Sequence, residues 1–171
     1  MSVLKSKRNH SKTQFVATAR EIFIEVEKFR TKLSERYSRT YGNDIYRYAR
    51  NVMLLCESSS SIWVKDELTY NIRRTYLLRA IAGLRSLDVM MYFVYEVINE
   101  NPQGCFRTSS KKLISSAEAV RRIDNMSVKL GTLIDLEIGL LKSVLEYHCS
   151  CGYSEDRDVH AAKNMLIFAN L

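Results

Sequence analysis

The fold is decided by residues 68–98, which read LTYNIRRTYLLRAIAGLRSLDVMMYFVYEVI. Apolar side chains recur there at steps of three and four over roughly 30 residues, which is the period of one helix face. This stripe comprises Leu68, Ile72, Tyr76, Leu77, Ala80, Leu84, Leu87, Met91, Val94 and Ile98. Pro102 is the sole proline of the chain and follows this stretch, where a helix must stop. The sequence therefore predicts one long amphipathic helix.

Three more apolar stripes with the same period lie on either side of this helix, over residues 15–33, 45–56 and 120–145. Residues 36–42 interrupt the pattern, so we expect Gly42 to be a pivot and Asn43 to cap the next helix. Ser115 and Glu118 have the spacing of a capping box for the last helix. Trp63, between the second and third helices, is expected to plug one end of their assembly.

No stretch of the chain alternates with a period of two, so no sheet is predicted. Amphipathic helices bury their apolar faces only against one another. We therefore expect an all-α fold, an up-down four-helix bundle with a short C-terminal appendage. The expected domains are a basic N-terminal arm over 1–12, the bundle over 13–147 and a tail over 148–171 of different character.

The charge of the chain is uneven. It has 26 basic and 19 acidic residues, a net charge of +7, and the excess lies in residues 1–85, which hold 17 basic and 8 acidic residues. Such asymmetry indicates a polyanionic partner. The longest apolar runs are only a few residues, and no signal-peptide pattern follows the basic start. We expect a soluble, cytoplasmic protein without membrane contact, whose cysteines are most simply free thiols.

Basic side chains that fall away from the apolar stripes are the candidate nucleic-acid contacts. They lie in the arm and in the second and third predicted helices, and they are Lys5, Lys7, Arg8, Arg47, Arg50, Arg73, Arg74, Arg79 and Arg85. Arginine pairs with phosphate oxygens through two donors, and tyrosines interleaved among these arginines could stack on unpaired bases. The alternative is that this basic face is an ordinary solvated surface.

Residues 1–147 resemble a known family in the opening MSVLKSKRNHSK, in Arg73-Arg74-x-Tyr76-Leu77-Leu78-x-Ala80 and in Leu87-Asp88. They are similar to the Avd-type four-helix-bundle proteins, the accessory variability determinants of diversity-generating retroelements. The resemblance implies a ring-shaped homo-oligomer, typically a pentamer, with a basic surface. It also implies binding to nucleic acid, RNA or DNA, and to a partner reverse transcriptase.

The tail carries a second resemblance, in Cys149-Ser150-Cys151-Gly152 and in DRDVHAAKN at 156–164. It is similar to the end of transposon OrfB-type nucleases, in which a zinc ribbon interrupts a RuvC-like domain. The chain lacks the earlier cysteine pair of the ribbon and the strands that carry the other carboxylates. We therefore expect a fused remnant without nuclease activity. Cys149 and Cys151 are free thiols in one interpretation. In others they bind zinc together with His148 and a fourth ligand such as His160, or share the ion across an oligomer.

No catalytic signature occurs in the sequence: it has no P-loop, no G-x-G-x-x-G and no Ser/His/Asp order. The leading hypothesis is a non-catalytic nucleic-acid-binding accessory protein of a diversity-generating retroelement or related mobile element, acting with a reverse transcriptase. One alternative is a transposase-related DNA-binding protein, or an inactive transposase remnant, with a zinc-binding tail. Another is a purely structural oligomer.

Overall fold

The computed structural model describes residues 14–107, 112–145, 147–148 and 154–155. Six of the residues proposed above to bind nucleic acid or zinc lie outside the described part of the chain. They are Lys5, Lys7 and Arg8 of the arm and Cys149, Cys151 and His160 of the tail. The following description is therefore of the helical part and of one short hairpin beyond it.

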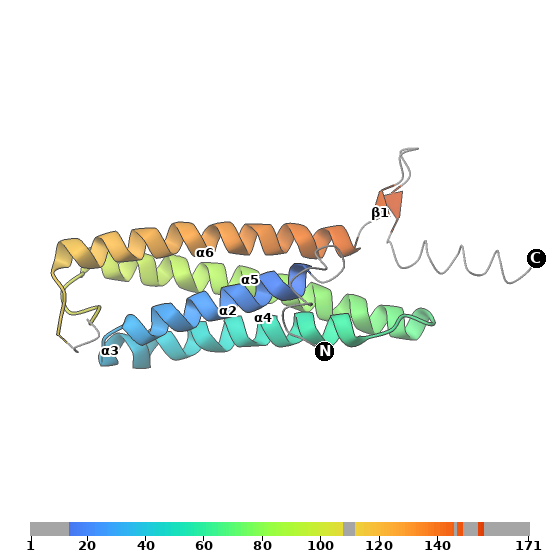
Figure 1. Ribbon diagram of the computed structural model, residues 1–171, viewed down its shortest axis with the longest axis horizontal. Helices are drawn as coiled ribbons and strands as arrows, with labels where there is room; N and C mark the ends of the chain where they lie inside the picture. The colour runs from blue at the N-terminus through green and yellow to red at the C-terminus, as the bar shows by residue number, and fades with distance from the viewer. Residues whose placement is uncertain (1–13, 108–111, 146, 149–153, 156–171) are drawn as a thin grey trace, which may run out of the picture.

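Four long helices lie side by side, and successive helices run in opposite directions (Figure 1). They are α2 (Gln14–Lys32), α4 (Asn43–Ser61), α5 (Glu67–Glu100) and α6 (Ser116–Leu145). Beyond α6, β1 (Tyr147–His148) pairs with β2 (Ser154–Glu155) in an antiparallel hairpin. The predicted all-α class is confirmed. The short hairpin is a small sheet that the sequence did not predict.

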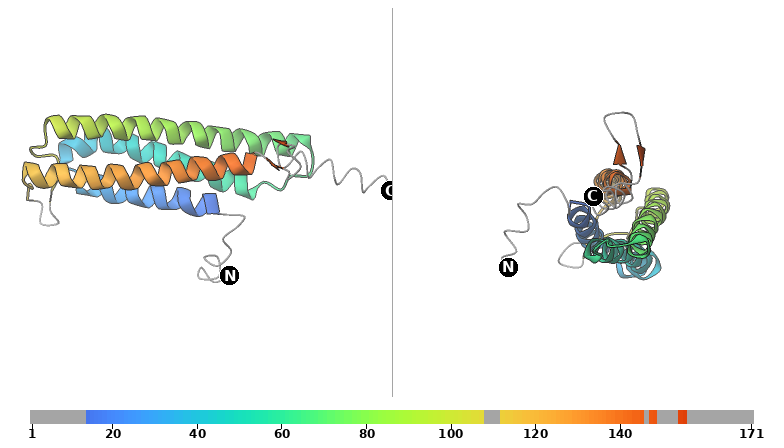
Figure 2. Two further views of the ribbon diagram at one scale, coloured as in Figure 1. Left: turned by 90° about the horizontal axis from the view of Figure 1, so that it is seen from above. Right: turned by 90° about the vertical axis from the view of Figure 1, so that its right-hand side faces the viewer.

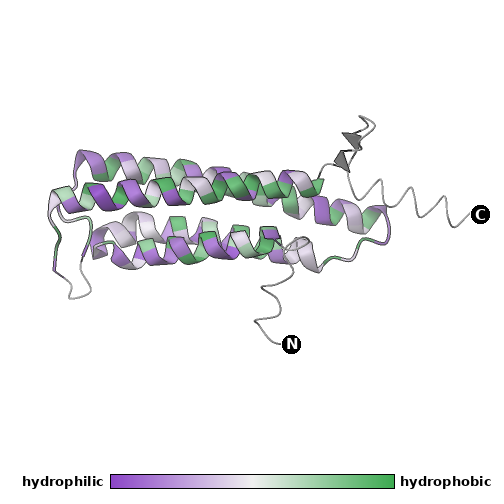
Figure 3. Ribbon diagram, turned by 45° about the horizontal axis from the view of Figure 1, so that its top comes forward, coloured by the Kyte–Doolittle hydropathy of each residue, from purple (hydrophilic) through white to green (hydrophobic). Residues whose placement is uncertain are grey.

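Each long helix packs against two others. α4 contacts α2 and α5, and α6 contacts α5 and α2, so the four surround one core (Figure 2). The predicted stripes supply this core: Ile22, Val52, Leu84 and Ile134 are all buried within it. Hydrophilic residues occupy the other faces of the helices (Figure 3). Within the described residues, no helix has both the length and the apolar character needed to cross a membrane.

The predicted pivot at Gly42 is wrong. The chain re-enters a helix at Glu35, after extended Ser34, and continues without interruption through α3 (Glu35–Tyr37) and η1 (Ser38–Gly42), a π-helical segment, into α4. Gly42 and Asn43 have helical backbone angles, so Asn43 does not cap α4. Gly42 instead gives room to α2, because a Cβ atom there would lie 3.0 Å from Cγ of Arg30. Gly42 therefore serves close packing against α2 and does not mark a turn.

The start of α5 is more exposed than its apolar stripe predicts. Asp66 caps the helix in a capping box with Thr69. Leu68 and Ile72 are 69% and 42% exposed, and the first buried side chain of α5 is Leu77. The reason is length, since α5 extends past the other long helices at this end of the molecule (Figure 1). Trp63 is 78% exposed here, so it does not plug the bundle.

The start of α6 agrees with the sequence. The backbone N–H of Glu118 donates to Oγ of Ser115 at 3.3 Å, which is half of the predicted capping box. α6 then buries one stripe of side chains that includes Ile123, Leu130 and Leu141. Its first half faces the second half of α2, and the candidate site lies between them.

Candidate anion-binding groove between α2 and α6

An open groove of about 740 Å³ separates the second half of α2 from the first half of α6. Phe29, Phe106 and Leu130 are buried and form its apolar floor, and charged side chains form its rims. The full lining comprises Glu25, Lys28, Phe29, Thr31, Lys32, Phe106, Arg107, Glu118, Arg121, Arg122, Asn125, Met126, Lys129 and Leu130. We call this feature the α2/α6 groove.

Helical spacing places the rim residues. Glu25, Lys28 and Lys32 follow one another at steps of three and four, so they lie along one edge of α2. Glu118, Arg122 and Lys129 lie along one edge of α6 for the same reason, since they are separated by four and seven positions. Because the two helices are antiparallel neighbours, these two polar edges face each other across the apolar floor.

Arg107 enters the groove from the connection between α5 and α6. Its backbone N–H donates to the carbonyl oxygen of Lys32 at 3.0 Å, and it forms an isolated β-bridge with Leu113. The preceding residue, Phe106, forms a similar bridge with Leu33 at the end of α2, and its ring meets Phe29 edge-on at 5.8 Å between centroids. The connection is thus fastened to the end of α2, and this attachment holds Phe106 and Arg107 in the lining of the groove.

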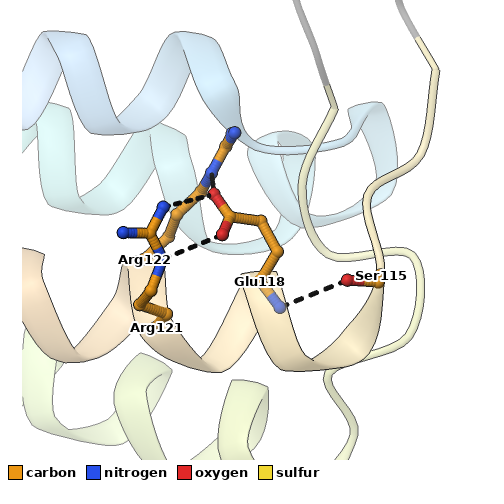
Figure 4. Close-up of polar contacts among 4 residues, drawn as sticks. All are labelled: Ser115, Glu118, Arg121 and Arg122. Atoms are coloured by element: carbon orange, nitrogen blue, oxygen red, sulfur yellow. Dashed lines mark hydrogen bonds and ion pairs between the residues drawn. The ribbon is translucent and has the colours of Figure 1, made fainter.

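Glu118 holds two guanidinium groups on the α6 rim (Figure 4). Nε of Arg121 and Nε of Arg122 lie 2.9 and 2.8 Å from its carboxylate oxygens. These hydrogen bonds to Arg121 and Arg122 lower the pKa of Glu118 to about 2. The carboxylate therefore stays ionised, and it positions two arginines whose remaining donors are available to a ligand.

Glu25 of α2 likewise holds two cations, one from its own helix and one from α6. Its carboxylate accepts hydrogen bonds from Nζ of Lys28 at 2.7 Å and from Nζ of Lys129 of α6 at 2.9 Å. These two contacts lower the pKa of Glu25. Lys129 and Glu25 thus link α2 to α6 along the groove.

The groove carries an excess of positive charge. Six basic and two acidic side chains occur among its described lining residues. In the described part of the chain, Lys32 and Arg107 have no carboxylate within ion-pair distance, and Nε of Arg107 is buried without a hydrogen-bond partner. The two carboxylates thus hold four of the cations in place, and Lys32 and Arg107 add two more. The excess positive charge makes the groove a site that attracts anions.

The arginines proposed from the sequence lie elsewhere on the molecule. Arg47 pairs with Asp44 at 3.0 Å on the exposed side of α4, where Arg50 is also exposed. On α5, Arg74, Arg79 and Arg85 are exposed and Arg73 is half-buried. None of these six residues lines the α2/α6 groove. Their contact with nucleic acid stays a prediction.

These arginines do not share a single face. Arg74 and Arg85 are eleven positions apart, about three full turns, so they point the same way along α5. Arg79 precedes Arg85 by six positions and points about a third of a turn away from it. The α5 arginines are thus spread around the exposed side of the helix.

Sequence reasoning missed the groove because four of its six cations come from the half of the chain with an acidic excess. These four are Arg107, Arg121, Arg122 and Lys129. The signal available in the sequence was a polar edge on each of two helices. The period of a helix does not show which edge of another helix it will face. A charge count over half of the chain also does not show the local positive charge of the groove.

The described part of the chain does not bring potential metal ligands together. No group of three or more His, Cys, Asp or Glu residues that could hold a metal ion occurs there. Cys56 and Cys105, the two cysteines that the structure describes, are free and buried. The proposed zinc ligands Cys149 and Cys151 lie outside the described residues, and zinc binding by the tail stays a prediction.

No known family model matches the sequence, and no curated protein and no solved structure matches it either.

Proposed function

We propose that the chain is a non-catalytic nucleic-acid-binding protein that contacts the phosphate backbone through the α2/α6 groove. The observation that carries this proposal is the groove's composition, with six basic side chains against two acidic ones over an apolar floor. Guanidinium and ammonium groups held in this way suit phosphate oxygens, and such contacts bind without reading base sequence. RNA and DNA are both candidates.

The wider setting of the proposal comes from the resemblance to Avd-type proteins. In that setting the helices form a closed up-down bundle, several copies assemble into a homo-oligomer, and the oligomer accompanies a reverse transcriptase. An oligomer would repeat the groove around its surface, and repeated phosphate contacts strengthen binding through effective concentration. The basic side chains of the arm, α4 and α5 would then add further contacts to the same polyanion.

Salt-titrated binding of a labelled 20-base-pair duplex tests this proposal. The double variant Lys32→Gln/Arg121→Gln removes two groove cations and leaves Glu118 paired with Arg122. We expect an affinity about tenfold lower at moderate salt, with the slope of log K against log salt reduced by about two, because two phosphate contacts are lost.

The matched control is Arg39→Gln/Lys142→Gln, which makes the same change in net charge at two exposed positions outside the groove. We expect it to bind almost as the wild type does. A third double variant, Arg50→Gln/Arg85→Gln, measures the surface predicted from the sequence. Equal losses in the groove variant and the control would contradict a specific groove, and no binding by the wild type at low salt would remove the proposed function.

A further inference from the structure

An exposed aromatic tip forms where α4 joins α5. Residues 62–66 connect the two helices, and Trp63 in this connection is 78% exposed. Leu68 and Ile72 at the start of α5 are also exposed. α2 and α6 do not reach this end of the molecule, so none of the long helices covers the tip (Figure 1). Three large apolar side chains exposed within ten residues of the chain are a candidate contact surface.

The backbone around Trp63 is well defined on both sides. The N–H of Ile62, in an extended conformation, donates to the carbonyl oxygen of Ser59 at 3.4 Å at the end of α4. Asp66 then starts α5 through its capping box, in which the N–H of Thr69 donates to Oδ1 of Asp66 at 2.8 Å. The indole is therefore displayed between two anchored helix ends, and less conformational entropy is lost when a ligand binds to it.

The stretch of chain that begins at the tip and runs into α5 has a net positive charge. Residues 62–79 contain four basic and two acidic side chains. One of the two acids, Asp66, uses its carboxylate in the cap of α5, and Thr69 holds its pKa below the ordinary value. Lys65, Arg74 and Arg79 are exposed on the same stretch of chain. An exposed indole that is followed along α5 by exposed cations suits an unpaired base together with the phosphates of its strand.

The tip and the α2/α6 groove lie at opposite ends of the helices. The groove involves the end of α2 and the start of α6, whereas the tip is the junction of α4 and α5 (Figure 1). The two surfaces can therefore be tested separately. They also differ in chemistry, because the described rim of the groove holds no aromatic ring, while an exposed indole is the main feature of the tip.

We propose that Trp63 stacks on an unpaired base, which makes the tip a contact for single-stranded RNA or DNA. This inference rests on the proposed nucleic-acid function and narrows it to strands with accessible bases. Paired bases in a duplex are stacked on one another and closed to the indole. The α2/α6 groove contacts backbones in either form, so preference for single strands comes from the tip.

The chain provides its own probe, because Trp63 is its only tryptophan. We expect a single-stranded oligothymidylate to quench the emission of the full chain in a saturable way, since stacking brings the base against the indole. A duplex of the same length should bind without comparable quenching. Unchanged emission while fluorescence anisotropy of a labelled oligonucleotide shows binding would overturn this inference and leave the proposed function standing.

Substitution of Trp63 distinguishes base stacking from electrostatic attraction to the phosphates. Trp63→Ala should lower the ratio of single-strand to duplex affinity by about tenfold, and Trp63→Phe should retain part of that ratio, because phenylalanine also offers a ring face. The matched control is Val128→Ala, which removes an apolar side chain that is 71% exposed on α6. We expect this control to keep the wild-type ratio.

Two other occupants of the tip would give different results. If the tip contacts anionic lipid or a second copy of the chain, lipid vesicles or a rise in protein concentration will bury the indole in an apolar environment and shift its emission to shorter wavelength. If either shift occurs while single-stranded oligonucleotides leave the emission unchanged, the inference is overturned in favour of a lipid or protein contact. An unchanged affinity ratio in Trp63→Ala would overturn it as well.

Discussion

Glu137 is a carboxylic acid in the middle of the core. It lies on the buried stripe of α6, three positions after Ile134 and four before Leu141, and it is fully buried. Sγ of Cys56 donates to its Oε1 at 3.5 Å, and Oε2 has no hydrogen-bond partner among the described residues. Burial raises the pKa of Glu137 to about 8, against an ordinary value of 4.5. The folded protein therefore prefers this side chain protonated.

This preference predicts stability that falls as pH rises. Between pH 4.5 and about 8 the folded state keeps a proton on Glu137 that the unfolded state has lost, so each step up in pH favours unfolding. The contribution is complete below pH 4.5 and is lost as pH rises through about 8. Glu137→Gln removes this dependence, and it should raise the free energy of unfolding at pH 8 by roughly 1–4 kcal/mol.

Urea denaturation at pH 5, 6.5 and 8 measures the effect. The wild type and Glu137→Gln should differ least at pH 5 and most at pH 8. Cys56→Ser serves as a companion variant, because it keeps a donor beside Oε1 and should preserve the pH trend. Parallel pH profiles for the wild type and Glu137→Gln would show that the carboxyl is not titrating within the fold.

Glycines in the long helices have different roles that only packing reveals. A Cβ atom at Gly83 would lie 2.9 Å from Cγ2 of Val52, so the absence of a side chain lets α5 approach α4 closely. Gly131 and Gly139 in α6 have nothing within 4 Å of such an atom. The sequence shows the same residue in the same kind of helix at all three positions, although one of them fixes a helix–helix distance.

Alanine substitution should therefore have opposite effects at these positions. Gly83→Ala should destabilise the protein by about 1–3 kcal/mol, because Val52 is buried and cannot move away freely. Gly139→Ala should stabilise it by about 0.5–1 kcal/mol through helix propensity. Thermal and urea denaturation measure both changes. Val52→Ala in the Gly83→Ala background should recover part of the loss, and a stabilising Gly83→Ala would contradict the close approach.

At the scale of the whole molecule, the α2/α6 groove is built from parts that are distant in the sequence. Lys28 and Lys32 come from the basic half of the chain, whereas Arg107, Arg121 and Lys129 come from the half with more acidic than basic residues. Antiparallel packing of α2 and α6 brings them together. The resulting charge is local to the groove and is larger than the linear distribution suggests.

The groove should bind anions with little dependence on pH. No histidine occurs among its described lining residues, and the pKa values of Glu25 and Glu118 both lie below the ordinary value. Lysine and arginine side chains are ordinarily protonated at neutral pH. Duplex affinity at fixed ionic strength should therefore change less than about threefold between pH 5.5 and 8. Over the same range the free energy of unfolding should decrease because of the buried carboxyl of Glu137. A larger change in affinity would mean that a titrating group outside the groove takes part.

Much of the helical pattern could be predicted from the sequence. The capping spacing at Ser115 was right, and so was the all-α class. The errors at Gly42, Leu68 and Trp63 share one cause. Each depends on which other helix passes nearby, and the period of a single helix carries no such information.

The sequence by itself determined where the long helices lie and which side of each is apolar, because helix propensity and side-chain period are local properties. Only the tertiary structure decided the rest. The packing of the helices decided how much of α5 is left exposed and that Glu137 is buried in the core. It also decided that the charged edges of α2 and α6 face each other across one groove. Each of these is a contact between residues far apart in the chain, and such contacts follow from the packing of whole helices.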